Sequence, residues 1–482
     1  MGCHTMTTPV IPLARTESFW NGEILPTLMD YIRIPNQSPA FDPDWKRRGA
    51  MDQAIRLASE WCRAHLPAHA RLEIRELAGR TPLLYFEVPP DPSLAHLPPL
   101  FMYGHLDKQP PFEGWREGLG AWTPVLDQGR LYGRGGADDG YAVFASVAAL
   151  RLLTDMGRPL PRSIGLIECS EESGSIDLAA HLDALQSRLD RPGLIVCLDA
   201  ECGDYVHLWQ TTSLRGNLIG ELRVQVLTEG VHSGAAGGIV PSTFQILRAL
   251  LDRIENAATG EITLAGLAVA IPSARKQEMR ETASALGDLV WEKFPWAGST
   301  QPRFRHPEEV LLANTWRAAL EITGAEGLPS IQGGGNVLRP MTAIKLSLRL
   351  PPTLEPNSAA QAIEAVLSAD APFQAQTSFI VHSAMSGWNA PETASWLATA
   401  LQQASLAHFD APALSMGTGG SIPFMQMLAD RYPSTQYFVT GVLGPSANAH
   451  GPNEFLDLKT VTRLTACLGE VIAAYVGAAP RI

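Results

Sequence analysis

The sequence predicts an α/β protein with a parallel sheet, interrupted by a smaller inserted α+β domain. Short apolar runs alternate with amphipathic stretches through the first two hundred residues, which is typical of alternating strands and helices. After Trp209, strands of alternating polarity replace the apolar runs, and the earlier pattern returns from about residue 385. A chain of 482 residues is also too long for one ordinary domain. We therefore expect a core domain in two parts, residues 1–213 and 385–482, and an inserted domain over residues 214–384.

Three buried strands and one helix are expected in the first part of the core domain. The apolar runs at 100–103, 163–169 and 194–198 are short enough to be strands of a parallel sheet. Between the first two, Val143, Val147 and Leu150 recur at spacings of three and four, which predicts a helix over 140–156 that ends at Gly157. A strand, a helix and a strand in this order form a parallel pair with a right-handed crossover.

The inserted domain and the second part of the core have their own periodicities. Residues 218–227 and 344–350 alternate in polarity and are predicted strands, and 241–254 is a predicted amphipathic helix. In the second part of the core, a helix is expected near 392–407 and a strand at 436–440. The α/β pattern of the first part therefore continues after the insertion.

Composition and charge exclude several classes of protein. The net charge is −12 and no run is rich in Lys or Arg, so we expect no nucleic-acid partner. No stretch reaches about 18 uninterrupted apolar residues, so we expect no membrane-spanning helix. The six cysteines, among them Cys3, form no Cys-x-x-Cys pair, and the amino-terminal residues contain no continuous apolar run. These features predict a cytoplasmic protein with reduced thiols.

Ionisable residues follow most of the predicted strands. The clusters are His105 and Asp107 after the first strand, Asp138 and Asp139 before the helix, Glu171 and Glu172 after the second strand, Asp199 after the third, and His450 after the last. Ligands of open α/β sheets bind beyond the carboxyl ends of the strands, so we expect these clusters to converge on one crevice. Taken singly, each cluster also has an ordinary explanation, such as a helix cap, a turn or a solvated surface pair.

The residue types in these clusters favour a site for divalent metal ions. Imidazoles and carboxylates suit zinc, manganese and cobalt. Carboxylates this close together would repel one another strongly unless a cation neutralised them. Two ions about 3.5–4 Å apart would need one carboxylate that bridges them, and each ion would need an open position for water or substrate.

The order of these motifs resembles the co-catalytic di-zinc metallopeptidase family (M-twenty type) that includes carnosinase, other cytosolic dipeptidases, aminoacylase and glutamate carboxypeptidase. The resemblance rests on GHLDKQP (104–110), GWREGLGAWTPVLDQGRLYGRGGADDG (114–140), IECSEESGS (167–175), LWQTTSLRG (208–216), VHSG (231–234), LSLRLPP (346–352), GGSIP (419–423) and NAHGPNE (448–454). It implies a zinc-peptidase-like catalytic domain with a mixed, mainly parallel sheet. The inserted α+β domain would then be a lid or dimerisation domain, through which the chain would form a homodimer.

The resemblance also implies a role for each residue of the site. His105 and Asp199 would bind one metal ion, Glu172 and His450 the other, and Asp138 would bridge the two; Zn²⁺ is the first expectation, and Mn²⁺ or Co²⁺ stay open. Glu171 would be the general base that takes a proton from the attacking water. Asp107 would orient His105 through the other ring nitrogen. Glu171 and Glu172 are expected to point in different directions from an extended backbone.

Four further residues are candidates for binding the substrate. By resemblance, His232 would stabilise the oxyanion, often from a partner subunit, and Arg349 would pair with a substrate carboxylate. Otherwise, His232 would cap the following helix and Arg349 would face solvent. Gly420 and Ser421 would offer hydrogen bonds to the same carboxylate. Lys108, which stands where an apolar residue is common in the family, is expected to point to solvent.

The predicted reaction is hydrolysis of an amide bond in a small peptide, foremost a dipeptide. Removal of the acyl group from an N-acyl amino acid, or carboxypeptidase activity, would use the same chemistry and stays open. A catalytically silent binding protein of the same fold would have lost Glu171 or a metal ligand, and this chain retains them. No G-x-S-x-G motif indicates a serine hydrolase, and the glycines at 133–136 lack the spacing of a dinucleotide site.

Overall fold

The computed structural model describes residues 11–478, which form two compact units. Unit 1 contains the chain up to Thr211, Ala390–Ser415 and the chain from Met427 onward, and unit 2 contains Thr212–Asn389 and Met416–Gln426. The segment Met416–Gln426 thus groups with unit 2, although the boundaries expected from the sequence assign it to the core domain. The expectations about Cys3 and the other amino-terminal residues lie outside the described part of the chain.

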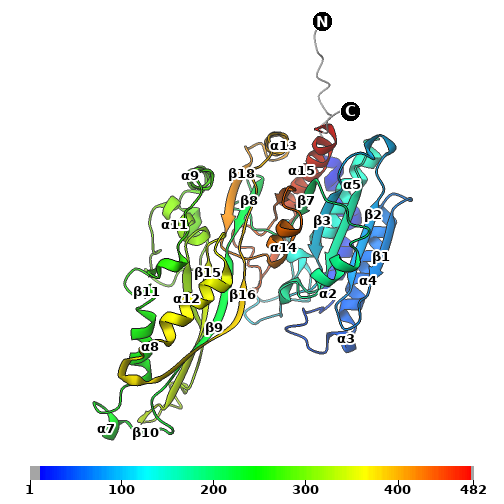
Figure 1. The fold of residues 1–482 in the computed structure, drawn as a ribbon. Coiled ribbons are helices and arrows are strands. Elements are labelled where there is room, and N and C mark those ends of the chain that lie inside the picture. Colours follow the sequence, from blue (N-terminus) through cyan, green and yellow to red (C-terminus); the bar gives the residue numbers. More distant parts are fainter. Residues whose placement is uncertain (1–10, 479–482) are drawn as a thin grey trace. The chain divides into compact units, whose positions relative to one another are not determined.

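Unit 1 combines a sheet with helices from both ends of the chain (Figure 1). Its strands are β1 (Arg71–Arg75), β2 (Leu83–Val88), β3 (Leu100–His105), β4 (Val125–Asp127), β5 (Arg130–Tyr132), β6 (Ser163–Glu168), β7 (Leu194–Cys197), β19 (Gln436–Val439) and β20 (Phe455–Asp457). Its helices and helical turns are α1 (Leu13–Phe19), η1 (Trp20–Ile24), α2 (Leu25–Arg33), α3 (Trp45–Arg48), α4 (Ala50–His65), η2 (Pro92–Leu94), η3 (Gly136–Gly140), α5 (Tyr141–Asp155), η4 (Glu171–Ser173), α6 (Leu178–Ala184), α13 (Ser395–Phe409) and α15 (Leu458–Gly477). The borders between the units fall within β8 (Trp209–Leu214), β18 (Leu414–Thr418) and α14 (Pro423–Arg431), and directly after β17 (Trp388–Asn389).

The main sheet of unit 1 has six strands in the order β1-β2-β6-β3-β7-β19. β3 pairs in parallel with β6 and β7, and β19 pairs in parallel with β7. At the other edge, β1 is antiparallel to β2, and β2 is antiparallel to β6. The sheet is therefore mixed and mainly parallel, as the resemblance predicts. Because β3, β6 and β7 run in parallel, their carboxyl ends lie at the same end of the sheet.

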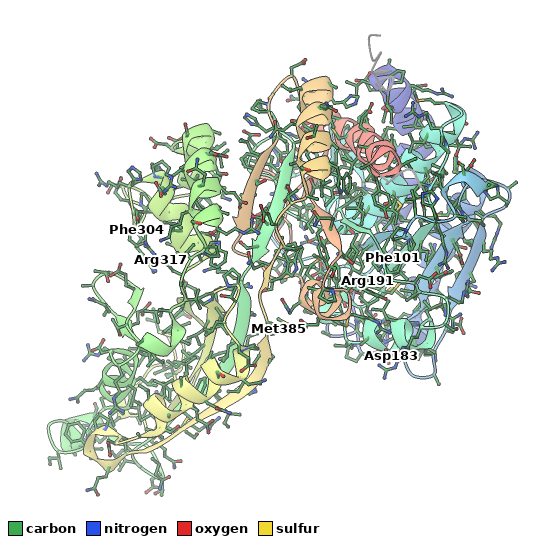
Figure 2. The ribbon with its side chains drawn as sticks, turned by 45° about the horizontal axis from the view of Figure 1, so that its top comes forward. Phe101, Asp183, Arg191, Phe304, Arg317 and Met385 are labelled. Atoms are coloured by element: carbon green, nitrogen blue, oxygen red, sulfur yellow. The ribbon has the colours of Figure 1, made fainter. Side chains whose placement is uncertain are left out.

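Helices cover this sheet and form a large apolar core with it. Helix α5 is almost fully buried, and Val143, Val147 and Leu150 are at most 1% exposed. It packs against β3 and α15, and α15 packs in turn against α13, while α4 packs against β1 and β2. Phe101 on β3 is buried, with its ring centre 5.7 Å from that of Tyr432, whereas Asp183 on α6 lies at the surface (Figure 2). Because strands and helices bury one another, the polar clusters are confined to the loops at the strand ends.

Unit 2 is built on an antiparallel sheet (Figure 1). Its strands are β9 (Gly216–Gln225), β10 (Val231–His232), β11 (Glu255–Asn256), β12 (Glu261–Ile262), β13 (Ala319–Glu326), β14 (Val337–Leu338), β15 (Met341–Leu350), β16 (Gln376–Met385) and β17. Its helices and helical turns are α7 (Ser233–Ala236), α8 (Thr243–Leu251), η5 (Ala265–Leu267), α9 (Ser273–Leu286), α10 (Leu289–Glu292), α11 (Pro307–Thr315), α12 (Pro356–Ser368) and η6 (Pro372–Gln374).

The four-stranded sheet of unit 2 has the order β13-β15-β9-β16. Burial alternates along β9, so that Leu218, Leu222 and Val224 face a second apolar core, which α8 and α12 cover. The chain between β12 and β13 adds helices beside this core, and there the Arg317 guanidinium lies 5.8 Å from the centre of the Phe304 ring (Figure 2). β13 and β16 are left as the edge strands.

Across residues 11–478, even α15 with its 20 residues falls short of the combined length and hydropathy that a bilayer-crossing helix requires.

Candidate metal centre and active site

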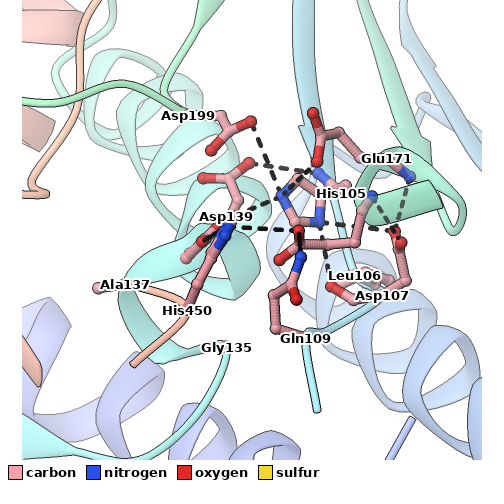
Figure 3. A network of polar contacts seen from close by, with 12 residues as sticks. His105, Leu106, Asp107, Gln109, Gly135, Ala137, Asp139, Glu171, Asp199 and His450 are labelled. Atoms are coloured by element: carbon pink, nitrogen blue, oxygen red, sulfur yellow. Dashed lines mark hydrogen bonds and ion pairs between the residues drawn. The ribbon is translucent and has the colours of Figure 1, made fainter. Parts of the chain in front are cut away.

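The candidate site lies at the carboxyl ends of the parallel strands of unit 1. His105 is the last residue of β3, Asp199 follows β7, and the turn η4 with Glu171 follows β6. Asp138 lies in the turn η3 just before α5, and His450 lies in the loop between β19 and β20. Side chains from these separate segments gather around the His105 ring (Figure 3). The parallel topology thus brings together residues that are up to about 345 positions apart, as expected for an open α/β sheet.

Two groups of potential metal ligands share one carboxylate. In each group the donor atoms lie within 4.8 Å of one another; one group is His105, Asp138 and Asp199, and the other is Asp138, Glu172 and His450. Asp138 directs Oδ1 toward His105 Nε2, at 3.4 Å, and Oδ2 toward His450 Nε2, at 3.0 Å. The two oxygens of Asp138 therefore face different imidazoles, which is the arrangement that a bridging carboxylate requires.

The His105 ring shows that this arrangement needs a positive charge. Nδ1 lies 3.1 Å from the backbone oxygen of Asp107, which only accepts hydrogen bonds, so we infer that Nδ1 carries a proton. Nε2 is buried and makes no hydrogen bond. Its neighbours are carboxylate oxygens of Asp138, Asp199 at 3.7 Å and Glu171 at 3.9 Å. A lone pair facing three carboxylates is unfavourable, so a proton or a metal cation must lie between them, and the donor set fits zinc.

The pKa shifts of the cluster also indicate that closely spaced carboxylates need a positive charge. Burial and the nearby Asp138 raise the pKa of Glu172 to about 8. Burial and Asp199 raise the pKa of Glu171 well above its usual range. The His450 side chain is 56% exposed; partial desolvation of its ring opposes the charged form, but Asp138 and Glu172 raise the pKa of the imidazole to about 9. These shifts favour the protonated forms of the three side chains, and divalent cations would have to displace such protons on binding.

Asp107 holds both the ring of His105 and the turn that carries the two glutamates. Its side-chain oxygens accept hydrogen bonds from the backbone N–H groups of Glu171, at 3.1 Å, and Glu172, at 3.0 Å. The two glutamates lie in the 3₁₀ turn η4, so the expected extended backbone is wrong; their backbone groups turn toward the Asp107 carboxylate instead. Their side chains still diverge, since Glu171 faces His105 and Glu172 Oε2 lies 3.4 Å from His450 Nε2.

The expectation that Lys108 points to solvent is wrong. Lys108 is fully buried, and Nζ donates hydrogen bonds to the backbone oxygens of Tyr31, at 2.7 Å, and Ile34, at 2.8 Å. These carbonyls lie at the carboxyl end of α2, where the helix dipole attracts a cation. The sequence gives no sign of this partner, because the two segments are more than 70 residues apart.

Two residues of the site were not singled out for a role from the sequence. Gln109 Nε2 donates to Glu172 Oε2 at 2.5 Å, and the Asp139 side chain accepts from the His105 backbone N–H at 3.2 Å. Both belong to motifs that carry ligands, GHLDKQP and GGADDG, and this proximity was the only available signal. Gln109 therefore helps to fix the Glu172 carboxylate, and Asp139 helps to fix the backbone at His105.

The candidates for substrate binding lie in unit 2. Arg349 Nη1 donates to Ser421 Oγ at 3.1 Å, and Ser421 Oγ donates to the backbone oxygen of Arg215. Arg349 therefore faces the loop that also contains Gly420, whose backbone oxygen accepts from the Arg215 N–H at 3.1 Å. His232 is exposed, and its Nδ1 accepts from the Gly234 N–H at 3.2 Å at the start of α7. Arg349, Ser421 and Gly420 thus form one cluster, and His232 lies outside it.

Known proteins share both the sequence and the fold of this chain. Residues 101–474 match Peptidase family M20/M25/M40. The Cysteinylglycine-S-conjugate dipeptidase of Corynebacterium striatum is 27% identical over 390 residues, which are 78% of this chain and 81% of that protein. The Beta-Ala-His dipeptidase of Mus musculus is 28% identical over 375 residues, which are 72% of each protein. The crystal structure of human carnosine dipeptidase 1 has the same fold, with a TM-score of 0.76 and 20% identity over 97% of this chain and 100% of that chain. Because the family match spans most of the sequence, this chain belongs to peptidase family M20/M25/M40.

Proposed function

We propose that this protein is a dipeptidase that uses two divalent metal ions, Zn²⁺ foremost, to hydrolyse the amide bond of a small peptide. The observation that carries the proposal is the shared carboxylate, because the two oxygens of Asp138 face His105 in one ligand group and His450 in the other. The dipeptidase names of the similar proteins support the substrate class.

Some residues of the site would bind the metal ions, and another would transfer the proton. His105, Asp138 and Asp199 would hold one ion, and Asp138, Glu172 and His450 would hold the other. When bound, such ions polarise the substrate carbonyl and lower the pKa of a water molecule. Glu171 belongs to neither ligand group, and its carboxylate lies 3.9 Å from His105 Nε2; it accepts a proton from the attacking water and returns it to the leaving amine nitrogen. Asp107 keeps Glu171 in place through its backbone N–H.

Unit 2 would supply the groups that recognise the substrate. The planar Arg349 guanidinium suits a substrate carboxylate, and Ser421 and the backbone at Gly420 would complete that subsite. His232 would stabilise the oxyanion with a ring nitrogen. Its exposure leaves Nε2 available for this contact while Nδ1 is engaged by Gly234.

We further propose that the protein is a cytoplasmic homodimer that pairs through unit 2. The edge strands β13 and β16 carry Ile322 and Ile380, whose exposed fractions are 52% and 50%, and a second copy would cover such side chains. The five described cysteines are buried, and none of them forms a disulfide within residues 11–478, which suits a reducing compartment. Sedimentation velocity of the purified chain would measure the oligomeric state directly.

A substrate panel with defined metals tests the function. The apoprotein, prepared with a chelator and reloaded with zinc, manganese or cobalt, is assayed against dipeptides and against N-acyl amino acids of the same carboxyl-terminal residue. We expect hydrolysis of dipeptides only when metal is restored. Faster cleavage of the N-acyl amino acids would replace the dipeptidase assignment with a deacylase, and turnover in the metal-free protein would remove the two-metal mechanism.

A further inference from the structure

A fully buried ion pair lies next to the candidate metal ligands. Arg134 Nη1 donates to Glu454 Oε2 at 2.6 Å, and the two side chains are 1% and 0% exposed. Removing two charges from water is expensive, and the attraction between them offsets this cost only when further hydrogen bonds satisfy both groups. The partners of these further bonds therefore show what the pair holds together.

Arg134 links the segment that follows β3 to the loop that carries His450. Its Nε donates to the backbone oxygen of Pro110 at 3.2 Å, and Nη2 donates to the backbone oxygen of Gly451 at 2.8 Å. Gly451 directly follows His450, and Pro110 ends the motif that begins with the His105 segment. One rigid guanidinium therefore contacts both imidazole-bearing segments, a task that its planar fork suits better than a lysine would.

Glu454 holds the third ligand-bearing segment. Its second oxygen, Oε1, accepts from the backbone N–H groups of Gly135 at 2.9 Å, Ala137 at 3.3 Å and Asp138 at 3.4 Å. Its own backbone oxygen accepts from the Gly133 N–H at 3.0 Å. The carboxylate thus gathers the N–H groups of the turn that presents Asp138, while its other oxygen is tied to Arg134.

We propose that Arg134 and Glu454 are positioning residues that lock the His105, Asp138 and His450 segments together, so that the ligands for both metal ions are held in place before metal binds. The inference rests on the two-metal site proposed above. Neither side chain is among the donors of that site, so the pair acts through the backbone of the ligand-bearing segments. Outer partners of this kind typically change metal affinity or activity by about 10–100-fold when they are lost.

The test compares this pair with another arginine–glutamate pair of unit 1. The variants are Arg134→Met and Glu454→Gln, with Arg162→Met and Glu87→Gln as controls, because Arg162 Nε donates to Glu87 Oε1 at 2.8 Å. Glu87 pairs with Ile164 near the start of β6, at the opposite end from η4. Zinc affinity is measured by competition with a chromogenic chelator, together with thermal unfolding of the metal-free proteins, kcat and KM.

We expect Arg134→Met and Glu454→Gln to weaken zinc binding about 10–100-fold and to lower kcat with little change in KM. The control variants should lower the unfolding temperature but leave zinc affinity and kcat within about 2-fold of the parent. Equal zinc affinity in the parent and in both Arg134 and Glu454 variants would overturn the proposal, and so would an equal loss of affinity in the controls.

A conservative variant keeps the proposal testable if Arg134→Met does not fold. Arg134→Lys retains the charge but cannot contact Glu454, Pro110 and Gly451 at once, so we expect zinc affinity between that of the parent and that of Glu454→Gln. Parent-like affinity in Arg134→Lys would contradict a role for the planar fork. Failure of the parent protein itself to bind two zinc ions would instead refute the proposed function, which makes the two failures distinguishable.

Discussion

Asp138 is the residue on which both ligand groups depend, since each of its oxygens faces a different imidazole. The adjacent glutamates Glu171 and Glu172 have different proposed roles because their side chains point in different directions. Glu171 lies on the His105 side, and Glu172 lies within 3.4 Å of His450. Removing the charge of Glu171 is therefore expected to affect turnover, whereas removing the charge of Glu172 is expected to affect metal binding.

We predict that Glu171→Gln still binds two metal ions but loses about 10²–10⁴-fold in kcat, because an amide of the same shape cannot accept the proton of the attacking water. Glu172→Gln should instead lose one of the two ions, because a neutral amide is a weaker ligand than a carboxylate. Metal content after gel filtration and steady-state kinetics measure both effects. Substantial activity in Glu171→Gln would remove this residue from the proposed mechanism.

The helices and strands were predicted well where burial alone determines them. The expected strands at 100–103, 163–169 and 194–198 correspond to β3, β6 and β7, and the expected helix at 140–156 corresponds to α5. Each is an apolar run or periodicity bounded by Gly or Pro, so its signal is local. The turn η4 and the buried Lys108 were missed because their partners, Asp107 and the end of α2, lie far away in the chain.

Packing between β2 and β6 depends on one glycine. Gly165 lies opposite Phe86 in the register of these strands, and a Cβ atom there would collide with the Phe86 ring. We predict that Gly165→Ala destabilises the protein by about 1–3 kcal/mol, because Phe86 is fully buried and has little room to move. Gly22→Ala is the control, since nothing lies within 4 Å of a Cβ at this helical position, and there a gain of up to about 1 kcal/mol is expected. Urea unfolding measures both, and equal effects would contradict the packing argument.

The antiparallel edge of the same sheet gives a pH-dependent contribution to stability. Burial opposes the charged form of Glu87, but hydrogen bonds from Arg162 and Tyr85 lower the pKa of its carboxyl below the usual value. A lowered folded-state pKa stabilises the protein above the unfolded-state pKa of about 4.3. That contribution is lost as the pH falls through the folded-state pKa.

We therefore predict that Glu87→Gln lowers the free energy of unfolding by about 1.5–3 kcal/mol at pH 7, and that the difference from the parent shrinks as the pH falls below about 4.3. Urea unfolding at a series of pH values measures this difference. Asp30→Asn removes an exposed ion pair with Arg33 and should change stability by less than about 1 kcal/mol at every pH. A Glu87→Gln effect that stays constant or grows on acidification would contradict the prediction.

At the scale of the whole molecule, the sequence indicated an insertion but could not assign every segment to its unit. Residues Met416–Gln426 group with unit 2, where Ser421 contacts Arg215 and Arg349. Ser421 and Arg215 are 206 residues apart in the chain, and Ser421 and Arg349 are 72 residues apart. Local periodicity in the sequence cannot predict contacts over such separations. The roles of these residues were instead expected from the resemblance to the family motifs.

If the proposed dimer shares residues between its active sites, one complete site needs groups from both subunits. If the oxyanion is stabilised by the partner's His232, a heterodimer of a His232→Ala chain and a Glu171→Gln chain contains one complete site, made of Glu171 from the first chain and His232 from the second. Co-expression with two different affinity tags and tandem purification isolates this heterodimer. We expect about half of the parent kcat per dimer, whereas both homodimeric variants stay nearly inactive. An inactive heterodimer that still binds metal would mean that His232 acts within its own chain, because each of its two sites would then lack one of the required groups.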